Sequence, residues 1–348
     1  MKIALALGAP MTAGPSSFED MIELGVGAEA LGVDSVWSSE GWGRDAFTPL
    51  AYLAARTSSV ALGTAIAQLS ARTAATTAMT ASSLDEMSQG RFRLGLGASG
   101  PAVVHGVHGS AYDRPIERMR ETIEVVRLAL RGERLEYGGR QIQLPREDSR
   151  SLRLSQPPRP NIPILVAAMS PRGLALAGEL ADGWIGHSFI PDRADDLLAP
   201  LHAGLAAAGR PRSSIELQVG GVVEIDEDVE SLLERWRPSL AFNIGAMGTD
   251  DRNFYRESYV RAGYAEAAAE VHRLWKAKDR DGAAQAVLPE MVLRTHMLGT
   301  PEMVADRVRC YVAAGIDTLR VQPAGRDVAG QLRNLETIVG IVSDVAPS

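Results

Sequence analysis

The stretch from residue 90 to residue 110, GRFRLGLGASGPAVVHGVHGS, concentrates the residue types that a ligand site at the end of a parallel strand requires. An apolar run over residues 92–96 leads directly into a turn of small residues: Gly95, Gly97, Ser99 and Gly100. Glycines permit positive φ angles and let the backbone approach a flat or anionic ligand closely. The pattern predicts a strand that ends in a ligand-binding turn, although a tight turn without a ligand fits the three glycines equally well.

The same glycines match the G-x-G-x-x-G spacing of dinucleotide-binding folds. That fold requires a helix that opens immediately after the glycines. Pro101, Val103 and Val104 make a poor first helical turn, so the sequence argues against a dinucleotide fold at this point.

Metal and serine chemistry find little support in the rest of the sequence. His105 and His108 form an i, i+3 pair, but no cluster of Cys, Asp or Glu lies close by to complete a ligand set. No G-x-S-x-G sequence follows a predicted strand, so no nucleophilic serine of that type is indicated. We therefore expect neither a metal site nor a serine hydrolase.

Composition sets the limits on fold and partners. The chain has 348 residues, of which 45% are hydrophobic, enough for the core of one large α/β domain or two ordinary ones. A net charge of -7 without a basic cluster argues against a nucleic-acid partner. Cys310 is the only cysteine, which excludes a disulfide within the chain and predicts a buried structural thiol. Without a signal-peptide pattern or an apolar run of spanning length, we expect a cytoplasmic protein and no membrane partner.

Apolar strand patterns and amphipathic helix patterns alternate along the chain. Strands are expected at residues 2–8, 33–37, 60–67, 92–96, 164–168, 183–186, 215–225 and 316–321. Helices fill the intervals, and Ser16 or Ser17 is expected to cap the first of them. Eight strands in one continuous series predict an α/β fold, a (β/α)8 TIM barrel with insertions, whose reactive site lies at the C-terminal strand ends.

Two segments interrupt the alternation. LEYGGRQIQL reads as two short strands around Gly138 and Gly139, which is a hairpin signal. Residues 227–290 are mostly helical in pattern. We therefore expect a single barrel domain over residues 1–348, with a hairpin insertion near 134–160 and a helical insertion near 227–300.

Several segments, in their order along the chain, resemble the bacterial luciferase-like flavin and deazaflavin oxidoreductases. The matching segments are GVDSVWSSE, LGTAIAQLSART, LDEMSQGRFRLGLGASG, YDRPIERMRETIEVVR and GTPEMVADRVRCYVAAGIDTL. Members of this family are barrels with an insertion that hold FMN or the deazaflavin coenzyme F420 across the strand ends. The resemblance is closest to the actinobacterial F420-dependent branch, and it implies F420 as the cofactor (alternative FMN), a small-molecule substrate and a homodimer.

By position, the resemblance places the cofactor ring against the third strand at Ala65, Ile66 and Gln68, with Glu40 nearby. It also suggests a non-proline cis peptide bond between Ala65 and Ile66. The turn after the fourth strand would line the same cleft with Gly97, Ala98, Ser99 and Gly100. The phosphate is expected at the helix start in AMSPRG, where backbone N–H groups and the helix dipole face an anion. Its residues are Met169, Ser170, Arg172 and Gly173, although an ordinary capped helix start also fits this segment.

The chain departs from the sugar-phosphate and alcohol dehydrogenases of the family, which carry Asp then His after the second strand. Glu40 and Gly41 stand there instead. Glycine cannot take an alcohol proton, so we expect a reductase. Histidine titrates near neutral pH and suits proton delivery after hydride transfer. The candidate catalytic groups at the strand ends are Glu40, His105, His108 and His187.

The resemblance leaves three functions open. A reductase would transfer hydride from reduced deazaflavin to an activated C=C or C=N bond. An FMN-dependent monooxygenase would react with oxygen and insert one atom, and a non-catalytic barrel would only bind a flavin.

Overall fold

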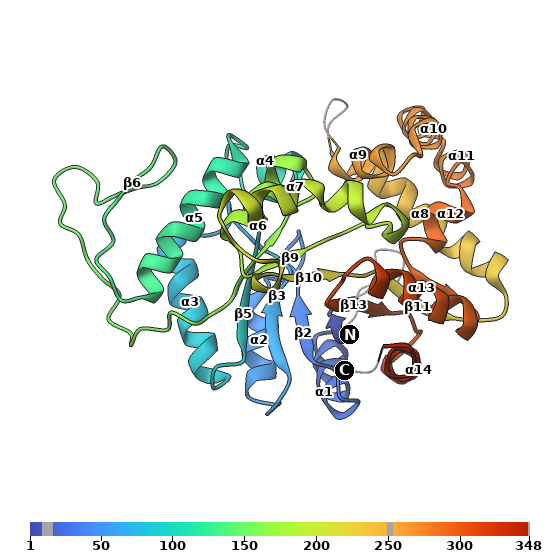
Figure 1. Cartoon of the computed structure of the whole chain (residues 1–348), viewed down its shortest axis with the longest axis horizontal. Helices are drawn as coiled ribbons and strands as arrows, with labels where there is room; N and C mark the ends of the chain where they lie inside the picture. The colour runs from blue at the N-terminus through green and yellow to red at the C-terminus, as the bar shows by residue number, and fades with distance from the viewer. Residues whose placement is uncertain (9–16, 249–252, 347–348) are drawn as a thin grey trace. The chain divides into compact units, whose positions relative to one another are not determined.

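The computed structural model describes residues 1–8, 17–248 and 253–346, in which parallel strands and helices alternate (Figure 1). The strands of the alternating series are β1 (Lys2–Ala6), β2 (Ser35–Ser38), β3 (Ala61–Thr64), β5 (Phe92–Gly97), β8 (Ile164–Ala167), β9 (Gly183–Ile185), β10 (Glu216–Val219) and β13 (Thr318–Pro323). They follow this order in one sheet, and β13 also pairs with β1, which closes the sheet. The predicted (β/α)8 barrel is confirmed.

The chain divides into two compact units. The first, which we call the terminal unit, comprises Met1–Val36, Gly186–Pro200 and Glu216–Ser348. The second, the central unit, comprises Trp37–Ile185 and Leu201–Ile215. Two elements, β2 and α7 (Ala194–Ala207), have residues in both units.

Two helices of the central unit, α3 (Ala74–Met87) and α6 (Pro171–Leu180), begin at a side-chain cap. The other helices of this unit are α2 (Phe47–Ala54), α4 (Pro101–Gly106), α5 (Pro115–Leu130) and the 3-10 turn η2 (Arg212–Ser214). Its further strands are β4 (Ala67–Gln68), β6 (Tyr137–Gly138) and β7 (Gln143–Leu144). Thr73 caps α3 by accepting a hydrogen bond from the Thr76 amide at 3.1 Å. Such caps satisfy donors that the first helical turn leaves unpaired.

The hairpin of β6 and β7 is held by one buried carboxylate. Glu121 in α5 is 4% exposed and accepts hydrogen bonds from the backbone amides of Arg140 at 2.9 Å, Gln141 at 2.9 Å and Ile142 at 2.6 Å. A side chain at Gly139 would place its Cβ 2.3 Å from the same carboxylate, so glycine is required there. A charged acceptor with three amide donors is a strong local anchor.

The terminal unit holds the remaining elements. Its helices are α1 (Phe18–Ala30), α8 (Val229–Ala246), α9 (Phe254–Arg261), α10 (Ala265–Lys276), α11 (Arg280–Gln285), α12 (Pro289–Leu293), α13 (Pro301–Ala313), α14 (Val328–Val345) and the 3-10 turn η1 (Pro191–Arg193). Its additional strands are β11 (Val222–Ile225) and β12 (Met297–Gly299). Ser17 caps α1 in a reciprocal capping box with Asp20, as predicted for one of two serines. The other, Ser16, lies outside the described residues.

A second apolar core forms where α8 to α12 pack together, and Figure 1 shows α10 and α11 beside α8. Its largest buried side chains are Trp236, Tyr259, Leu232, Leu240 and Met291. The mostly helical pattern of residues 227–290 therefore buries a core of its own. Both chain ends belong to this unit, where α1 packs against α14 and the Met1 amino group donates to the Ala346 carbonyl at 3.1 Å.

The seventh predicted strand, residues 215–225, is not continuous. Gly220 and Gly221 separate β10, which pairs with β13, from β11, which also pairs with β12. A Cβ on Gly220 would lie 1.7 Å from the Arg320 carbonyl oxygen. The two segments approach so closely that only glycine fits, and the strand is interrupted there. The sequence analysis also missed β12.

The segment after the glycine turn was expected to make a poor first helical turn. A helix does open there. α4 begins at Pro101 with Gly100 as its N-cap. Proline at the first helical position has no amide to leave unpaired, and its fixed φ suits a helix start. Val103 and Val104 are buried, so packing outweighs their low helix propensity. Among the described residues no helix is long and apolar enough to cross a membrane.

Candidate functional site

The third predicted strand consists of two pieces, β3 and β4, both paired in parallel with β5. Leu62 lies opposite Phe92 in the first piece, and Gln68 lies opposite Gly97 in the second. The peptide bond between Ala65 and Ile66, which joins the two pieces, is cis. The predicted cis bond is therefore confirmed, and the end of β4 lies beside the end of β5 in the central unit.

The glycines of β5 are required for close packing and not for positive φ. A Cβ on Gly95 would lie 1.9 Å from the Thr64 carbonyl oxygen, and one on Gly97 would lie 2.8 Å from the Ile66 side chain. Thr64 secures this approach, because its hydroxyl donates to the Gly95 carbonyl at 2.8 Å and accepts from the Gly95 amide at 2.9 Å. The residue with positive φ in the turn is Ser99, at 56°.

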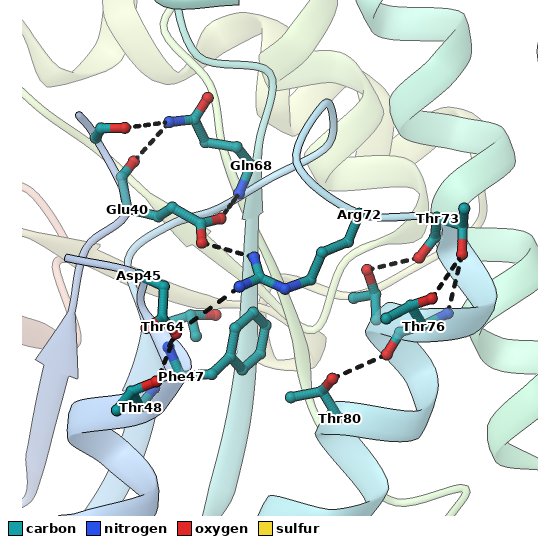
Figure 2. Close-up of polar contacts among 12 residues, drawn as sticks. Glu40, Asp45, Phe47, Thr48, Thr64, Gln68, Arg72, Thr73, Thr76 and Thr80 are labelled. Atoms are coloured by element: carbon teal, nitrogen blue, oxygen red, sulfur yellow. Dashed lines mark hydrogen bonds and ion pairs between the residues drawn. The ribbon is translucent and has the colours of Figure 1, made fainter. Parts of the chain in front are cut away.

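Glu40 lies between the end of β2 and the end of β4, where both its carboxylate oxygens accept hydrogen bonds (Figure 2). Oε2 accepts from the Gln68 amide at 2.9 Å, and Oε1 accepts from Nη1 of Arg72 at 2.6 Å. The Gln68 side chain in turn donates to the Glu40 carbonyl at 2.9 Å and to the Gly41 carbonyl at 3.1 Å. We call Glu40, Gln68 and Arg72 the carboxylate clamp.

Arg72 ties the clamp to α2. Its guanidinium lies 4.5 Å from the centre of the Phe47 ring, and Nη2 is 3.7 Å from Asp45 Oδ1 (Figure 2). Although partial burial raises it, the hydrogen bonds from Thr48 and Phe47 and the charge of Arg72 hold the pKa of Asp45 below its ordinary value. Arg72 thus remains paired with two carboxylates. The Glu40 side chain is 7% exposed, so this ion pair is largely shielded from solvent.

One buried acceptor in the clamp has no partner among the described residues. Oε1 of Gln68 is inaccessible to solvent and accepts no hydrogen bond, although both donors on the Gln68 amide nitrogen are used. An unmet buried acceptor costs about 1–3 kcal/mol. It therefore marks a position at which a ligand donor would be stabilising.

The segment AMSPRG opens α6 as predicted. Ser170 is the N-cap and accepts from the Gly173 amide at 3.2 Å, while Pro171 occupies the first helical position. A Cβ on Gly173 would lie 2.8 Å from the Ala168 Cβ, so the turn is tight. Arg172 is exposed, and Met169 is partly buried. The positive dipole end of this helix therefore carries an exposed cationic side chain.

The two histidines after the glycine turn differ in their contacts. His105 is exposed in α4, and its Nε2 accepts a hydrogen bond from the Tyr112 amide at 3.2 Å. The Tyr112 hydroxyl donates to the Ser99 carbonyl at 3.2 Å, which connects this loop with the glycine turn. Nε2 of His108 is buried and has no partner among the described residues.

His187 follows β9 and belongs to the terminal unit, whereas the clamp, the glycine turn, the start of α6 and the other two histidines belong to the central unit. Its Nδ1 lies 2.9 Å from the Ser188 hydroxyl, and its ring meets the Tyr255 ring edge-on at 5.1 Å. The His187 side chain is exposed at its surface, and desolvation of its inner part together with the positive charge of Arg320 lowers its pKa. Both effects favour the neutral imidazole.

Sequence reasoning missed Arg72 and Arg320. Arg72 lies in the matched segment LGTAIAQLSART, but no residue pattern shows that it pairs with Glu40, which is 32 positions away. Arg320 had a readable signal, because Thr318, Arg320 and Gln322 alternate with apolar residues in the last strand. Among the described residues no group of His, Cys, Asp and Glu is arranged to hold a metal ion.

Comparison with known proteins adds a family relationship. Residues 2–318 match the model of the luciferase-like monooxygenase family. A Mycobacterium tuberculosis protein with the provisional name coenzyme F420-dependent oxidoreductase is 35% identical, with 97% of this chain and 99% of that protein covered. The 5,10-methylenetetrahydromethanopterin reductase of Archaeoglobus fulgidus is 28% identical, with 86% of this chain and 88% of that enzyme covered.

A solved structure shares the fold. The coenzyme F420-dependent tetrahydromethanopterin reductase from Methanopyrus kandleri superimposes with a TM-score of 0.78, and 97% of each chain is covered. Its sequence is 22% identical to this one, so the similarity concerns the fold alone.

Proposed function

Because the chain belongs to the luciferase-like monooxygenase family, we propose that it is a coenzyme F420-dependent oxidoreductase, most simply a reductase. The observation that carries the proposal is the 35% identity, over nearly the whole of both chains, to the mycobacterial protein whose name states that activity. The archaeal reductase at 28% identity supports the same assignment. When bound, a reduced deazaflavin supplies a hydride for an acceptor with a C=C or C=N bond.

The residues of the central unit fit a flat ring. The ends of β4 and β5 lie side by side in register, and the accessible positions around them carry small side chains: Ala65, Ala98, Ser99 and Gly100. The Ile66 side chain packs against Gly97 and offers an apolar surface. The unpartnered Oε1 of Gln68 suits an N–H group on the edge of a ring. We propose that these residues and Gly97 hold the ring.

The start of α6 fits the phosphate of such a cofactor. Ser170, Arg172 and Gly173 provide a hydroxyl, a guanidinium and a helix amino end within four residues, and Met169 precedes them. Anions bind at helix amino ends because unpaired amides and the dipole favour negative charge. The Ser170 hydroxyl already accepts from the Gly173 amide, so its own hydrogen remains available for donation to a phosphate oxygen.

We propose that Glu40 positions the ring site and does not deliver a proton. Its two oxygens already accept hydrogen bonds from the Gln68 amide and the Arg72 guanidinium, which fixes the carboxylate between the ends of β2 and β4. His105, His108 and His187 remain our candidates for the proton donor. His105 and His108 lie in the same unit as the proposed ring site.

An FMN-dependent monooxygenase is the second candidate, and the description of the matching family, luciferase-like monooxygenase, favours it. Both functions use a ring site and a phosphate site. We also propose that the protein is a cytoplasmic homodimer that acts on a small molecule. Light scattering on the purified protein tests whether it is a dimer.

The test is a fluorescence titration of the purified protein with F420 and with FMN, followed by anaerobic and aerobic turnover. We expect F420 to bind at least tenfold more tightly and its reduced form to be consumed without oxygen when an enone or imine is supplied. Tighter FMN binding with oxygen consumption would establish the monooxygenase instead. Binding without turnover under either condition would point to the non-catalytic barrel, and binding of neither cofactor would reject all three.

A further inference from the structure

One face of the sheet in the terminal unit is polar where a barrel is normally apolar. Thr318, Arg320 and Gln322 alternate along β13 and share one face, while Leu319 and Val321 occupy the other. In β10, Gln218 lies in register with Thr318 and is fully buried. Neither polar atom of the Gln218 amide has a partner among the described residues. The face therefore offers hydrogen-bonding groups that the described protein does not use.

Arg320 is the charged group of this face. Its Nε is buried without a partner among the described residues, and Nη2 donates one long hydrogen bond of 3.4 Å to the Gly186 carbonyl. No carboxylate of the described residues forms an ion pair with it. The residue as a whole is only partly buried, so part of the guanidinium remains accessible. Its N–H groups are therefore available to a negatively charged ligand group.

Neutral donors surround the same region. His187 follows Gly186, whose carbonyl Arg320 contacts, and its ring lies edge-on against Tyr255 at 5.1 Å. Arg320 thus contacts the residue directly before His187, and His187 contacts Tyr255, so the three side chains belong to one connected set of contacts. His296 is oriented by the Val222 amide, which donates to its Nδ1 at 3.2 Å, so Nε2 carries the proton and has no partner among the described residues.

We propose that Arg320, with His187 and Tyr255 as neutral donors, binds a carboxylate group of a small-molecule ligand. A guanidinium presents planar paired N–H groups that match the two oxygens of a carboxylate. Charge matching favours a carboxylate over a phosphate, because the cluster has a single positive charge and a phosphate dianion normally meets more. This assignment does not depend on which cofactor binds to the central unit.

The test follows the imidazole Hε1 resonance of His187 by NMR in the cofactor-free protein. The resonance is identified among the six histidines by its loss in His187→Gln. Benzoate is the probe, and benzamide, which has the same shape without the charge, is its control. We expect saturable shifts with benzoate, shifts at least tenfold weaker with benzamide, and weaker binding of inorganic phosphate than of benzoate. Equal shifts from benzoate and benzamide, or tighter phosphate binding, would overturn the proposal, and both comparisons are made on the wild-type protein.

Variants then locate the charge. Arg320→Gln should weaken benzoate binding at least tenfold and Arg320→Lys less, whereas Arg309→Gln, at an exposed arginine paired with Asp306, should leave it unchanged. Circular dichroism checks that each variant is folded. Unchanged benzoate binding in folded Arg320→Gln would reject the assignment. Displacement of benzoate by saturating F420 or FMN would assign the guanidinium to the cofactor and overturn the ligand proposal.

Discussion

The Glu40 carboxylate and the Arg72 guanidinium form an ion pair of 2.6 Å that joins the chain after β2 to the chain after β4. Glu40→Gln removes the charge but preserves the shape. Because the pair is largely shielded, we expect the free energy of unfolding to fall by about 1–3 kcal/mol. Urea unfolding measures the loss. Glu117→Gln, which removes a charge paired with Arg114 and Arg140 on the surface, should change stability by less than about 0.5 kcal/mol.

The same substitution separates positioning from proton delivery. If Glu40 positions Gln68, Glu40→Gln weakens cofactor binding more than it lowers the turnover number. A turnover number that falls while the cofactor dissociation constant stays fixed would return Glu40 to the role of proton donor.

Gly97→Ala should disturb the proposed ring site through Ile66. The new methyl group would lie 2.8 Å from the Ile66 side chain, and overpacking of this kind costs about 1–3 kcal/mol. Cofactor affinity should fall as well, because Ile66 must move. Adding Ile66→Ala to Gly97→Ala should recover part of the lost stability, and the four proteins form a double-mutant cycle. Gly340→Ala in α14, where nothing lies within 4 Å, is the control without a clash, and it should raise stability by up to about 1 kcal/mol because alanine favours helix. Strict additivity in the cycle would show that the two residues are not coupled.

Substitutions of Ser170 and Arg172 should differ in their effects on stability and on cofactor affinity. Ser170→Ala removes a helix cap and should cost about 1 kcal/mol of stability along with cofactor affinity. Arg172→Gln should leave stability unchanged and weaken F420 or FMN binding by about 10- to 100-fold, the equivalent of one charge-assisted bond. Thr300→Ala removes the cap of α13, which has the same cap-proline arrangement, and serves as the control. Cofactor affinity that is equal in wild type and the Ser170→Ala, Arg172→Ala double variant would remove α6 from the phosphate site.

His296 should make the protein acid-sensitive. Desolvation and the nearby His187 lower the pKa of His296 to about 3, well below its ordinary value. The unfolded chain therefore binds a proton between about pH 6.5 and pH 3 that the folded chain does not, so stability is lost as the pH falls through this range. His296→Asn retains an acceptor for the Val222 amide, and its unfolding free energy should fall less steeply from pH 6.5 to pH 4. Identical slopes for the two proteins, from urea unfolding at each pH, would contradict this prediction.

The alternation of strands and helices was sufficient to predict the barrel, because buried strands and amphipathic helices have distinct periods. The interruptions were not predictable in the same way. Gly220 is required by the Arg320 carbonyl in β13, about a hundred positions later in the chain, and Gly221 by the Thr295 carbonyl. α4 forms because Val103 and Val104 find a buried surface, which overrides their local preference. Both features depend on tertiary contacts that no local window contains.

The site shows the same division. The cis bond at Ala65 and the helix start at Ser170 lie within short matched segments and were predicted. The glycines were predicted to provide freedom of φ and close approach to a ligand, whereas Gly95 and Gly97 allow close approach to Thr64 and Ile66 of the neighbouring segment. Which strands become neighbours decides that Glu40 pairs with Arg72. It also decides that Arg320 has no carboxylate partner among the described residues. The residue types and the matched segments suggested which residues form the site. Their partners depend on strand pairing in the closed sheet.

Glu121 holds the hairpin through hydrogen bonds from three backbone amides, at positions 140–142. These bonds need no particular side chain, apart from the glycine at 139. Any residue except proline, which has no amide hydrogen, can therefore replace Arg140, Gln141 or Ile142 while the three bonds are kept. The hairpin is thus a position at which related proteins, or a designer, can install new surface chemistry without rebuilding the scaffold beneath it.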